Sequence, residues 1–547
     1  MRPSAVVAPL VAASLARAAL HIPIKRYASS VAPFHRVTAA AGSANTTTGV
    51  GSLNVINGQN AIYIGDIAID GTSVPVQLDT GSADLWIYAN DFPGILSNAR
   101  NYTDISLNIT YGIGSVSGNV SVIDIEFVDM PVPKQALLNA LKTEQLDGLF
   151  EVGAYGVLGL GANSLSNIYL ATQKKFNDSR GQTVLSNIFA ANLTEPNHIA
   201  FFLDRMGDLE GSSPGTLSVG TYNTKYSAVQ YQPELPVFDP NARVQRWSTL
   251  IDAVELSGKN ITFGKSVVSG VPKGKALAVL DTGTTDLYMP KATAEAWFES
   301  IPSAVYVSTE DVWLVDCRAE LQFAIWFKGN RFPIHPLDLT LPHARPLFSF
   351  PNATYCSFQV ISTADGENLL DYLLGDVFLR NVYSVFDFGD TDPQTGKNGD
   401  PYIKLLSITD EATMIADFHA SRNQSLAALP PLGNLTAVAA ADKKANPSGA
   451  SLASADAAGG NGSSDSSVGV NVNKLVGWAP AMLGLLGFNA LALFALVVIG
   501  VALLRRGKGE TGSVGTPRYQ PLHLPPRKAE HAPYEEPLYE EYRYSDA

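Results

Sequence analysis

A nine-residue stretch built around Asp-Thr-Gly occurs twice in this chain of 547 residues. Residues 78–86 read Leu-Asp-Thr-Gly-Ser-Ala-Asp-Leu-Trp, and residues 280–288 read Leu-Asp-Thr-Gly-Thr-Thr-Asp-Leu-Tyr. The copies share six of nine residues, lie 202 residues apart, and each follows an apolar run. Apolar-apolar-Gly stretches at 157–159 and 373–375 echo the two copies further along the chain. An internal repeat of this kind predicts two related lobes.

The repeat gives each lobe one carboxylic acid, Asp79 or Asp281, at the end of an apolar strand. The glycine two residues later lets the backbone turn tightly, and the threonine hydroxyls of Thr80 and Thr282 can bond across to the other copy. A pseudo-twofold axis between the lobes would bring the two carboxyls face to face. Carboxyls that close share one proton, so they can hold a water between a base and an acid. A single copy would be an ordinary turn, whereas two matching copies favour catalysis over a purely structural repeat.

The chain from about residue 50 to 410 has the pattern of a mostly β protein. The runs at 61–69, 74–78 and 121–128 alternate or are continuously apolar, are rich in β-branched residues, and are separated by Gly, Pro, Asn and Asp clusters. Helical patterns are short, with candidates at 185–192 and 292–300.

These motifs resemble the pepsin-like aspartic endopeptidases, of a membrane-anchored fungal type, over about residues 52–408. The resemblance implies a mostly β, bilobal fold with pseudo-twofold symmetry and a cleft between the lobes, to which the sequence adds one C-terminal transmembrane helix. It also implies hydrolysis of internal peptide bonds at acidic pH by a water between Asp79 and Asp281, without metal or cofactor. The residues expected to support this dyad are Thr80, Gly81, Ser82, Thr282, Gly283 and Thr284.

Residues 109–118, which read Ile-Thr-Tyr-Gly-Ile-Gly-Ser-Val-Ser-Gly, resemble the flap hairpin of this family. The resemblance places Tyr111 and Gly112 over the substrate and makes Trp86 the hydrogen-bonding partner of the tyrosine. Ile113 departs from the small or polar residue often found at its position. We expect Ile113 to add an apolar wall to a subsite, in keeping with hydrophobic residues around the scissile bond.

The cysteine count and the charge exclude other classes of protein. Two cysteines cannot form a disulfide scaffold or a Cys-ligated zinc site, and no His-Glu-x-x-His is present. A net charge of −13 argues against nucleic-acid binding, which needs basic patches. In an oxidising compartment Cys317 and Cys356 would pair with each other, and they resemble the second-lobe disulfide of the pepsin-like family.

The two ends of the chain predict passage through the secretory pathway and a membrane anchor. Arg2, a short apolar run and a small-x-small cleavage pattern are typical of a signal peptide. A stretch of 30 uncharged residues near the other end is long enough to span a bilayer, and the basic residues after it place the tail in the cytosol. Eleven Asn-x-Ser/Thr sequons all lie on the luminal side. The predicted segments are a signal peptide (1–18), a propeptide (19–50), an N-terminal lobe (51–235), a C-terminal lobe (236–410), a low-complexity luminal stalk (411–474), a transmembrane helix (475–504) and a cytosolic tail (505–547).

The expected partners are protein or peptide substrates and a membrane crossed by a single span, for a monomeric type I protein of the cell surface or of a vacuole or endosome. Residues Tyr519 to Leu522, Tyr-Gln-Pro-Leu, fit a tyrosine-based signal read by a sorting adaptor. Two other functions stay open. One is a non-catalytic peptide- or protein-binding receptor on the same fold, and the other is a membrane adaptor that acts through its tail.

Overall fold

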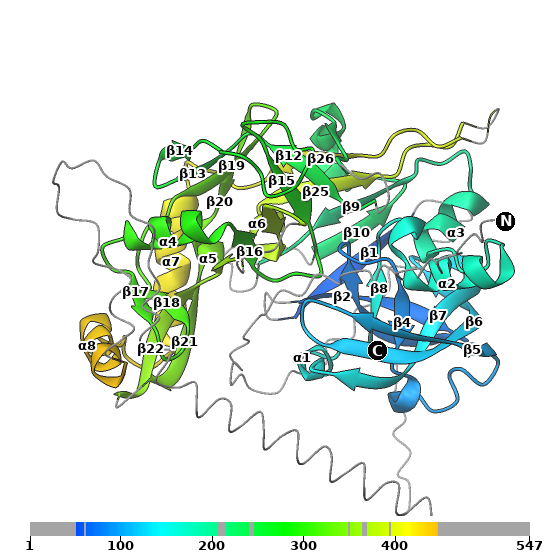
Figure 1. The fold of residues 1–547 in the computed structure, drawn as a ribbon, viewed down its shortest axis with the longest axis horizontal. Coiled ribbons are helices and arrows are strands. Elements are labelled where there is room, and N and C mark those ends of the chain that lie inside the picture. The colour runs from blue at the N-terminus through cyan, green and yellow to red at the C-terminus, as the bar shows by residue number, and fades with distance from the viewer. Residues whose placement is uncertain are drawn as a thin grey trace, which may run out of the picture. The chain divides into compact units, whose positions relative to one another are not determined.

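A computed structural model describes residues 51–58, 62–205, 215–239, 245–347, 350–363, 369–392, 395 and 397–446, and these belong to one compact unit (Figure 1). The predicted signal peptide, propeptide, transmembrane helix and cytosolic tail, with the sorting signal, lie outside the described residues. No helix within the described ranges is long and apolar enough to cross a bilayer.

Each copy of the repeat lies in the same three-stranded arrangement. In the first lobe, β3 (Thr72–Asp79) runs parallel to β8 (Gly156–Gly159), and β8 pairs on its other side with the antiparallel β4 (Leu85–Ile87). In the second lobe, β24 (Tyr372–Leu374) lies in the same way between β15 (Ala276–Leu280) and β16 (Leu287–Met289). The equivalent pairing confirms the prediction of a mostly β, bilobal fold. It also shows that the apolar-apolar-Gly stretches at 157–159 and 373–375 belong to the central strand of each arrangement.

Burial explains why the sequence forms strands here. In β3 the residues Val74, Val76 and Leu78 are buried in alternation, and the side chains between them are more exposed. All five residues of β15 are buried, as expected for a strand that is covered on both faces.

The other strands of the first lobe are β1 (Gly51–Gly58), β2 (Ile62–Ile69), β5 (Arg100–Thr110), β6 (Ser115–Phe127) and β7 (Met130–Glu144).

The second lobe is built from short strands, most of which pair antiparallel. Its remaining strands are β12 (Ser248–Ile251), β13 (Ala253–Leu256), β14 (Lys259–Ile261), β17 (Val305–Val307), β18 (Val312–Val315), β19 (Phe323–Phe327), β20 (Asn330–Ile334), β21 (Thr340–Leu347), β22 (Phe350–Phe358) and β23 (Val360–Ser362). The disulfide predicted between Cys317 and Cys356 is present, with Cα atoms 5.1 Å apart, and it joins the loop two residues after β18 to β22.

One sheet joins segments from both halves of the chain. From one edge its strands are, in order, β11 (Leu235–Pro236), β26 (Tyr402–Ser407), β25 (Val382–Asp387), β9 (His198–Phe202), β10 (Gly215–Val219) and β1, and the sheet continues from β1 into β2 of the first lobe. Every residue of β9 and β25 is buried. The two lobes therefore share a continuous hydrogen-bonded support beneath the repeat.

The helices between the strands are short. Two of them, α3 (Val184–Ala191) and α4 (Lys291–Glu299), match the predicted helices within one residue at each end. The others in the lobes are α1 (Asp147–Glu151), α2 (Asn167–Phe176), α5 (Pro336–Leu339), α6 (Asp376–Leu379) and the 3-10 turns η1 (Ala89–Asp91), η2 (Asn163–Leu165) and η3 (Thr224–Tyr231).

The prediction of a flexible stalk from residue 411 is wrong for the part that the structure describes. This part forms two helices, α7 (Met414–Ala427) and α8 (Leu435–Ala445), and α8 packs beside β17 (Figure 1). Between the helices, the Thr354 N–H donates to the Pro431 carbonyl at 2.9 Å, and the Gly433 N–H donates to the Thr354 carbonyl at 2.8 Å. Alanine-rich composition is compatible with a helix because alanine has the highest helix propensity. Residues 447–474 of the predicted stalk lie outside the described residues.

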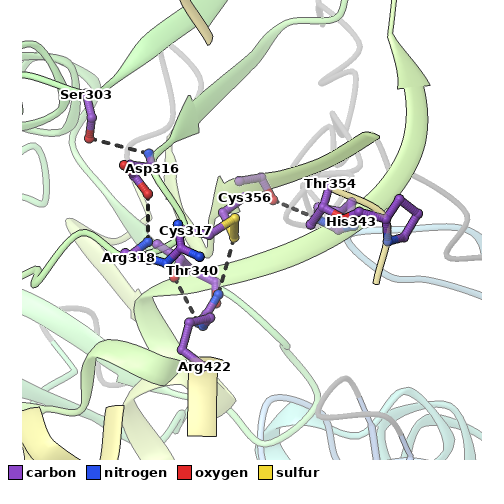
Figure 2. Close-up of a disulfide and its surroundings, with 11 residues drawn as sticks. Ser303, Asp316, Cys317, Arg318, Thr340, His343, Thr354, Cys356 and Arg422 are labelled. Atoms are coloured by element: carbon purple, nitrogen blue, oxygen red, sulfur yellow. Dashed lines mark hydrogen bonds between the residues drawn. A yellow bond between two sulfur atoms is a disulfide. The ribbon is translucent and has the colours of Figure 1, made fainter. Parts of the chain in front are cut away.

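The first of these helices also contacts the disulfide. Figure 2 shows the Arg422 guanidinium reaching Cys356 and Thr340: it donates to the Cys356 Sγ at 3.3 Å and to the Thr340 carbonyl at 2.9 Å. Burial lowers the pKa of Arg422 to about 10. The helix is therefore part of the C-terminal lobe.

Candidate active site

The two repeated threonines brace the lobes against each other. The Thr80 N–H donates to the Thr282 Oγ1, and the Thr282 N–H donates to the Thr80 Oγ1, both at 3.0 Å. The hydroxyls in turn donate to backbone carbonyls of the opposite copy, Thr80 to Leu280 at 3.1 Å and Thr282 to Leu78 at 2.8 Å. Both threonines are at most 1% exposed. Because water does not reach this bridge, it does not compete for the four hydrogen bonds. These bonds therefore fix how the two strand ends meet.

Each carboxyl is held by the same two donors. The Gly81 N–H donates to the Asp79 Oδ1 and the Gly283 N–H to the Asp281 Oδ1, both at 2.8 Å. The outer oxygens accept from hydroxyls three residues on, Asp79 from Ser82 and Asp281 from Thr284. This matched set orients both carboxyls in the same way about the pseudo-twofold axis.

The carboxyls also meet across the interface between the lobes. A Cβ at Gly81 would lie 2.4 Å from the Asp281 Oδ1, and a Cβ at Gly283 would lie 2.2 Å from the Asp79 Oδ1. Each carboxyl thus lies against the glycine of the other copy, in space that a side chain would fill. The glycines are required here for close approach as well as for the turn.

This proximity changes the acidity of the pair. Burial raises the pKa of the Asp79 carboxyl well above its usual range, and the neighbouring Asp281 charge raises it further, against the lowering effect of the Ser82 hydroxyl. The pair therefore keeps a proton at pH values at which a free carboxyl is ionised. Such a pair can offer one acid and one base at the same time.

The flap hairpin lies next to this pair. It is formed by β5 and β6, and its turn is closed by a bond from the Tyr111 N–H to the Gly114 carbonyl at 3.0 Å. The Trp86 Nε1 donates to the Tyr111 Oη at 2.8 Å, as the resemblance implied. Burial raises the pKa of Tyr111, with contributions from the Asp84 and Asp79 charges. Gly112 and Ile113 occupy the half-buried turn itself.

The family model described as eukaryotic aspartyl protease matches residues 62–396, more than half of the chain. The chain belongs to this family. It is 25% identical over 386 residues to Aspergillopepsin-1 of Emericella nidulans, covering 68% of this chain and 85% of that protein. It is also 25% identical over 360 residues to the aspartic-type endopeptidase ctsD of Aspergillus fumigatus, covering 63% of this chain and 67% of that one. This aspartyl protease is accordingly an aspartic-type endopeptidase of the pepsin-like class, with proteins or peptides as substrates.

A solved structure shares the fold of this aspartyl protease. The aspartic proteinase from Irpex lacteus aligns with a TM-score of 0.50 and 20% identity, over 67% of this chain and 99% of that one. Within the part of the aspartyl protease that the structure describes, no group of three or more His, Cys, Asp or Glu side chains is arranged to hold a metal ion.

Three residues beside the dyad of this aspartyl protease were not predicted as site residues. Gln77 donates from its Nε2 to the Gly283 carbonyl at 3.2 Å, which adds a further bond between the lobes. Asp376, the first residue of α6, is fully buried, and neither carboxyl oxygen has a hydrogen-bond partner among the described residues. Burial raises its pKa well above the usual range, the Arg380 charge opposes this, and the Asp281 charge adds to it. The third residue, Arg246, is not part of any of the sequence motifs described above.

Proposed function

We propose that Asp79 and Asp281 are the catalytic acids of this endopeptidase and that they act through a water bound between them. The observation that carries the proposal is the reciprocal placement of each carboxyl against the glycine of the other copy. The braced threonines support it, because a dyad must keep its geometry while substrate enters and product leaves. The raised pKa of Asp79 supports a shared proton.

In the proposed reaction, the ionised carboxyl takes a proton from the water while the water oxygen attacks the scissile carbonyl carbon. The protonated carboxyl donates to the carbonyl oxygen, which becomes a hydroxyl of the tetrahedral intermediate. As the C–N bond breaks, the carboxyl that took the water's proton passes it to the leaving nitrogen, and one hydroxyl of the intermediate returns its proton to the other carboxylate. The products are an amine and a carboxylic acid, and the dyad again holds a single proton. The rate should be highest at acidic pH, between the two apparent pKa values of the pair.

The flap supports a preference for hydrophobic residues around the scissile bond. Ile113 stands at its tip, and Trp86 anchors the tyrosine beside it.

We further propose that the protein is made as a zymogen with residues 19–50 as propeptide. Residues 1–50 carry five basic and no acidic residues, whereas 51–504 carry a net charge of −18. At neutral pH the basic segment should therefore be attracted to the acidic part of the protein. This attraction weakens as the carboxylates take up protons, which favours activation on acidification.

The uncharged stretch at 475–504, the sequons and the signal peptide support a single-pass glycoprotein of the secretory pathway with a luminal or extracellular protease. The segment boundaries at 18, 50, 235, 474 and 504, a monomeric state, and sorting through Tyr519 to Leu522 belong to the same proposal.

The test is cleavage of a denatured protein at about pH 3–6, with and without pepstatin. We expect pepstatin-sensitive cleavage, and a loss of at least about 100-fold in kcat for Asp79→Asn and Asp281→Asn, since each removes one half of the acid–base pair. Asp91→Asn, on the exposed turn η1, is the matched control and should keep full activity. A folded wild-type protein that binds pepstatin but cleaves nothing would instead indicate the peptide-binding receptor.

A further inference from the structure

Arg246 lies next to the dyad although it belongs to no motif. It comes two residues before β12, which pairs antiparallel with β15 so that Ser248 faces Val279. The pairing continues beyond the strand, because the Leu280 N–H donates to the Trp247 carbonyl at 2.8 Å. One further step in this register sets Arg246 beside Asp281.

The neighbours of Arg246 in the chain are tied to the other lobe. The Gln245 N–H donates to the Ser164 Oγ at 3.1 Å, and the Trp247 Nε1 donates to the Leu160 carbonyl at 3.2 Å. Leu160 is itself bonded to the dyad strand, since its N–H donates to the Asp79 carbonyl at 2.7 Å. The backbone of Arg246 is therefore fixed at the junction of the two lobes.

The guanidinium of Arg246 is unpaired within the described part of the chain. It has no ion pair or hydrogen bond there, and the charges that act on it are those of Asp281 and Asp239. Burial lowers its pKa, but an arginine side chain stays charged at any pH at which a protein is folded. A largely buried cation without a partner is costly, and a planar guanidinium offers two parallel N–H groups to a carboxylate.

The arrangement matches a substrate carboxylate better than it matches a structural ion pair. Asp281 is already satisfied by Gly283 and Thr284, and it must remain free to exchange its proton. A peptide in the cleft would bring its own side chains past Asp281 and thus past Arg246.

We propose that Arg246 is a specificity-determining residue that binds an Asp or Glu side chain of the substrate next to the scissile bond, on the side of the dyad formed by Asp281. This inference rests on the proposed endopeptidase function. Hydrophobic residues fill the remaining subsites, so the preferred peptide has one acidic residue in an otherwise apolar stretch. Because the substrate carboxyl ionises above about pH 4, the preference should grow as the pH rises from 3 to 5.5.

The experiment compares peptides that differ only by Glu or Gln at one position, with the position moved along both sides of the scissile bond. Full-length protein is assayed at pH 3 and 5.5. At pH 5.5 we expect kcat/KM to favour Glu over Gln by about tenfold at one position on one side, the effect of one charge-assisted hydrogen bond. At pH 3 the ratio should fall towards one.

The ratio of kcat/KM for the Glu peptide to that for the Gln peptide is then measured in variants. This ratio separates an effect of the arginine on specificity from an effect on overall activity. Arg246→Gln should bring the ratio at pH 5.5 to about one, and Arg246→Lys should restore part of it. Lys259→Gln, the same loss of charge on the exposed edge strand β14, should leave the ratio as in the wild type.

Two results would overturn the inference: a wild-type ratio near one at every position, or a ratio that Arg246→Gln does not change. If that variant shifts only the pH profile on the Gln peptides, Arg246 acts on Asp281 and not on substrate. Cleavage of the Gln peptides tests the proposed function separately. A wild-type protein that cleaves neither peptide of any pair removes both, whereas cleavage without acidic preference removes only the inference.

Discussion

At the scale of single residues, the site depends on two glycines, because a side chain at either residue would occupy the space of a carboxyl. Gly81 and Gly283 each leave room for the carboxyl of the opposite copy, and a methyl group at either residue would overlap a carboxyl oxygen. Neither carboxyl can retreat without breaking its bonds to a backbone N–H and a hydroxyl. The geometry of the dyad is thus set by steric exclusion and by hydrogen bonds together.

Gly81→Ala should therefore disable catalysis without unfolding the protein. A Cβ at 2.4 Å from the Asp281 Oδ1 must displace that carboxyl, and a misplacement of about 1 Å at a reacting group can cost about 100-fold in rate. We expect a fall of that size in kcat, measured by peptide hydrolysis, with the circular dichroism spectrum retained. Gly264→Ala is the control, since nothing lies within 4 Å of its Cβ and its φ is unremarkable. Wild-type kcat in Gly81→Ala would show that the Asp281 carboxyl does not lie against Gly81.

The sequence predicted the residues that lie within a few positions of the repeat, and it missed those that arrive from elsewhere. Ser82 and Thr284 follow their carboxyls by three residues, so a motif carries them. Arg246 lies 35 positions before Asp281 and reaches it only through the register of β12 on β15. Because a long connection and not a tight turn joins β12 to β15, no short motif in the sequence indicates their register.

At the scale of secondary structure, the segment after residue 410 shows how composition can mislead. A helix such as α8 needs little apolar surface if polar contacts fix it to the lobe. Its Val438 is buried, and its Asp442 carboxylate accepts from the backbone N–H and the hydroxyl of both Ser308 and Thr309, at 2.8–3.1 Å. Composition averages over 411–474 do not reveal such contacts. Strands were predicted more reliably, because β3 and β15 carry their burial pattern in the sequence.

Asp442→Ala should release α8 from the lobe and leave the dyad intact. Burial raises the pKa of Asp442, but its bonds to Ser308 and Thr309 outweigh this and lower it overall. Losing them should cost about 1–3 kcal/mol in the local opening free energy. Hydrogen exchange at the Ser308 and Thr309 amides would measure this, and peptide hydrolysis should be unchanged. Lys444→Ala, on the exposed face of α8, is the control. Protection that stays at the wild-type level would mean that the carboxylate does not hold the helix.

At the scale of the whole molecule, buried ionisable groups pull stability in opposite directions as the pH changes. Burial, with the Arg205 charge, lowers the pKa of His335 to about 4. The unfolded chain therefore binds a proton between about pH 6.5 and 4 that the folded chain does not, and stability falls as the pH falls. Burial alone would raise the pKa of Asp338, but Arg205 and Arg380 hold it well below its usual range, so its contribution is lost below about pH 4.

Asp79 and Asp376 act in the other direction. Their pKa values are raised by burial, so the folded protein keeps protons that the unfolded chain releases above about pH 4. Stability from these groups is full below that pH and is lost as the pH rises towards the raised values. The proposed catalytic dyad and its buried neighbour thus stabilise the folded protein at acidic pH, whereas His335 and the Asp338 ion pairs lose their contribution as the pH falls further.

Asp376→Asn separates these contributions, because it removes one raised carboxyl and keeps nearly the same shape. At about pH 3.5 both states of the wild type carry the proton, so the variant should unfold at nearly the wild-type temperature. At pH 7 it should be more stable, by about 1.4 kcal/mol for each pH unit by which the folded pKa exceeds the unfolded one. Thermal unfolding at pH 3.5, 5 and 7 measures this difference.

Asp338→Asn is the matched comparison and should behave in the opposite way. It breaks buried ion pairs with Arg205 and Arg380, so its destabilisation should be large at pH 7 and should shrink as the pH falls below about 4. If Asp376→Asn were instead less stable than the wild type at pH 7, Asp376 would be ionised and held by Arg380. In that case the decline of stability towards neutral pH would have to come from the dyad alone.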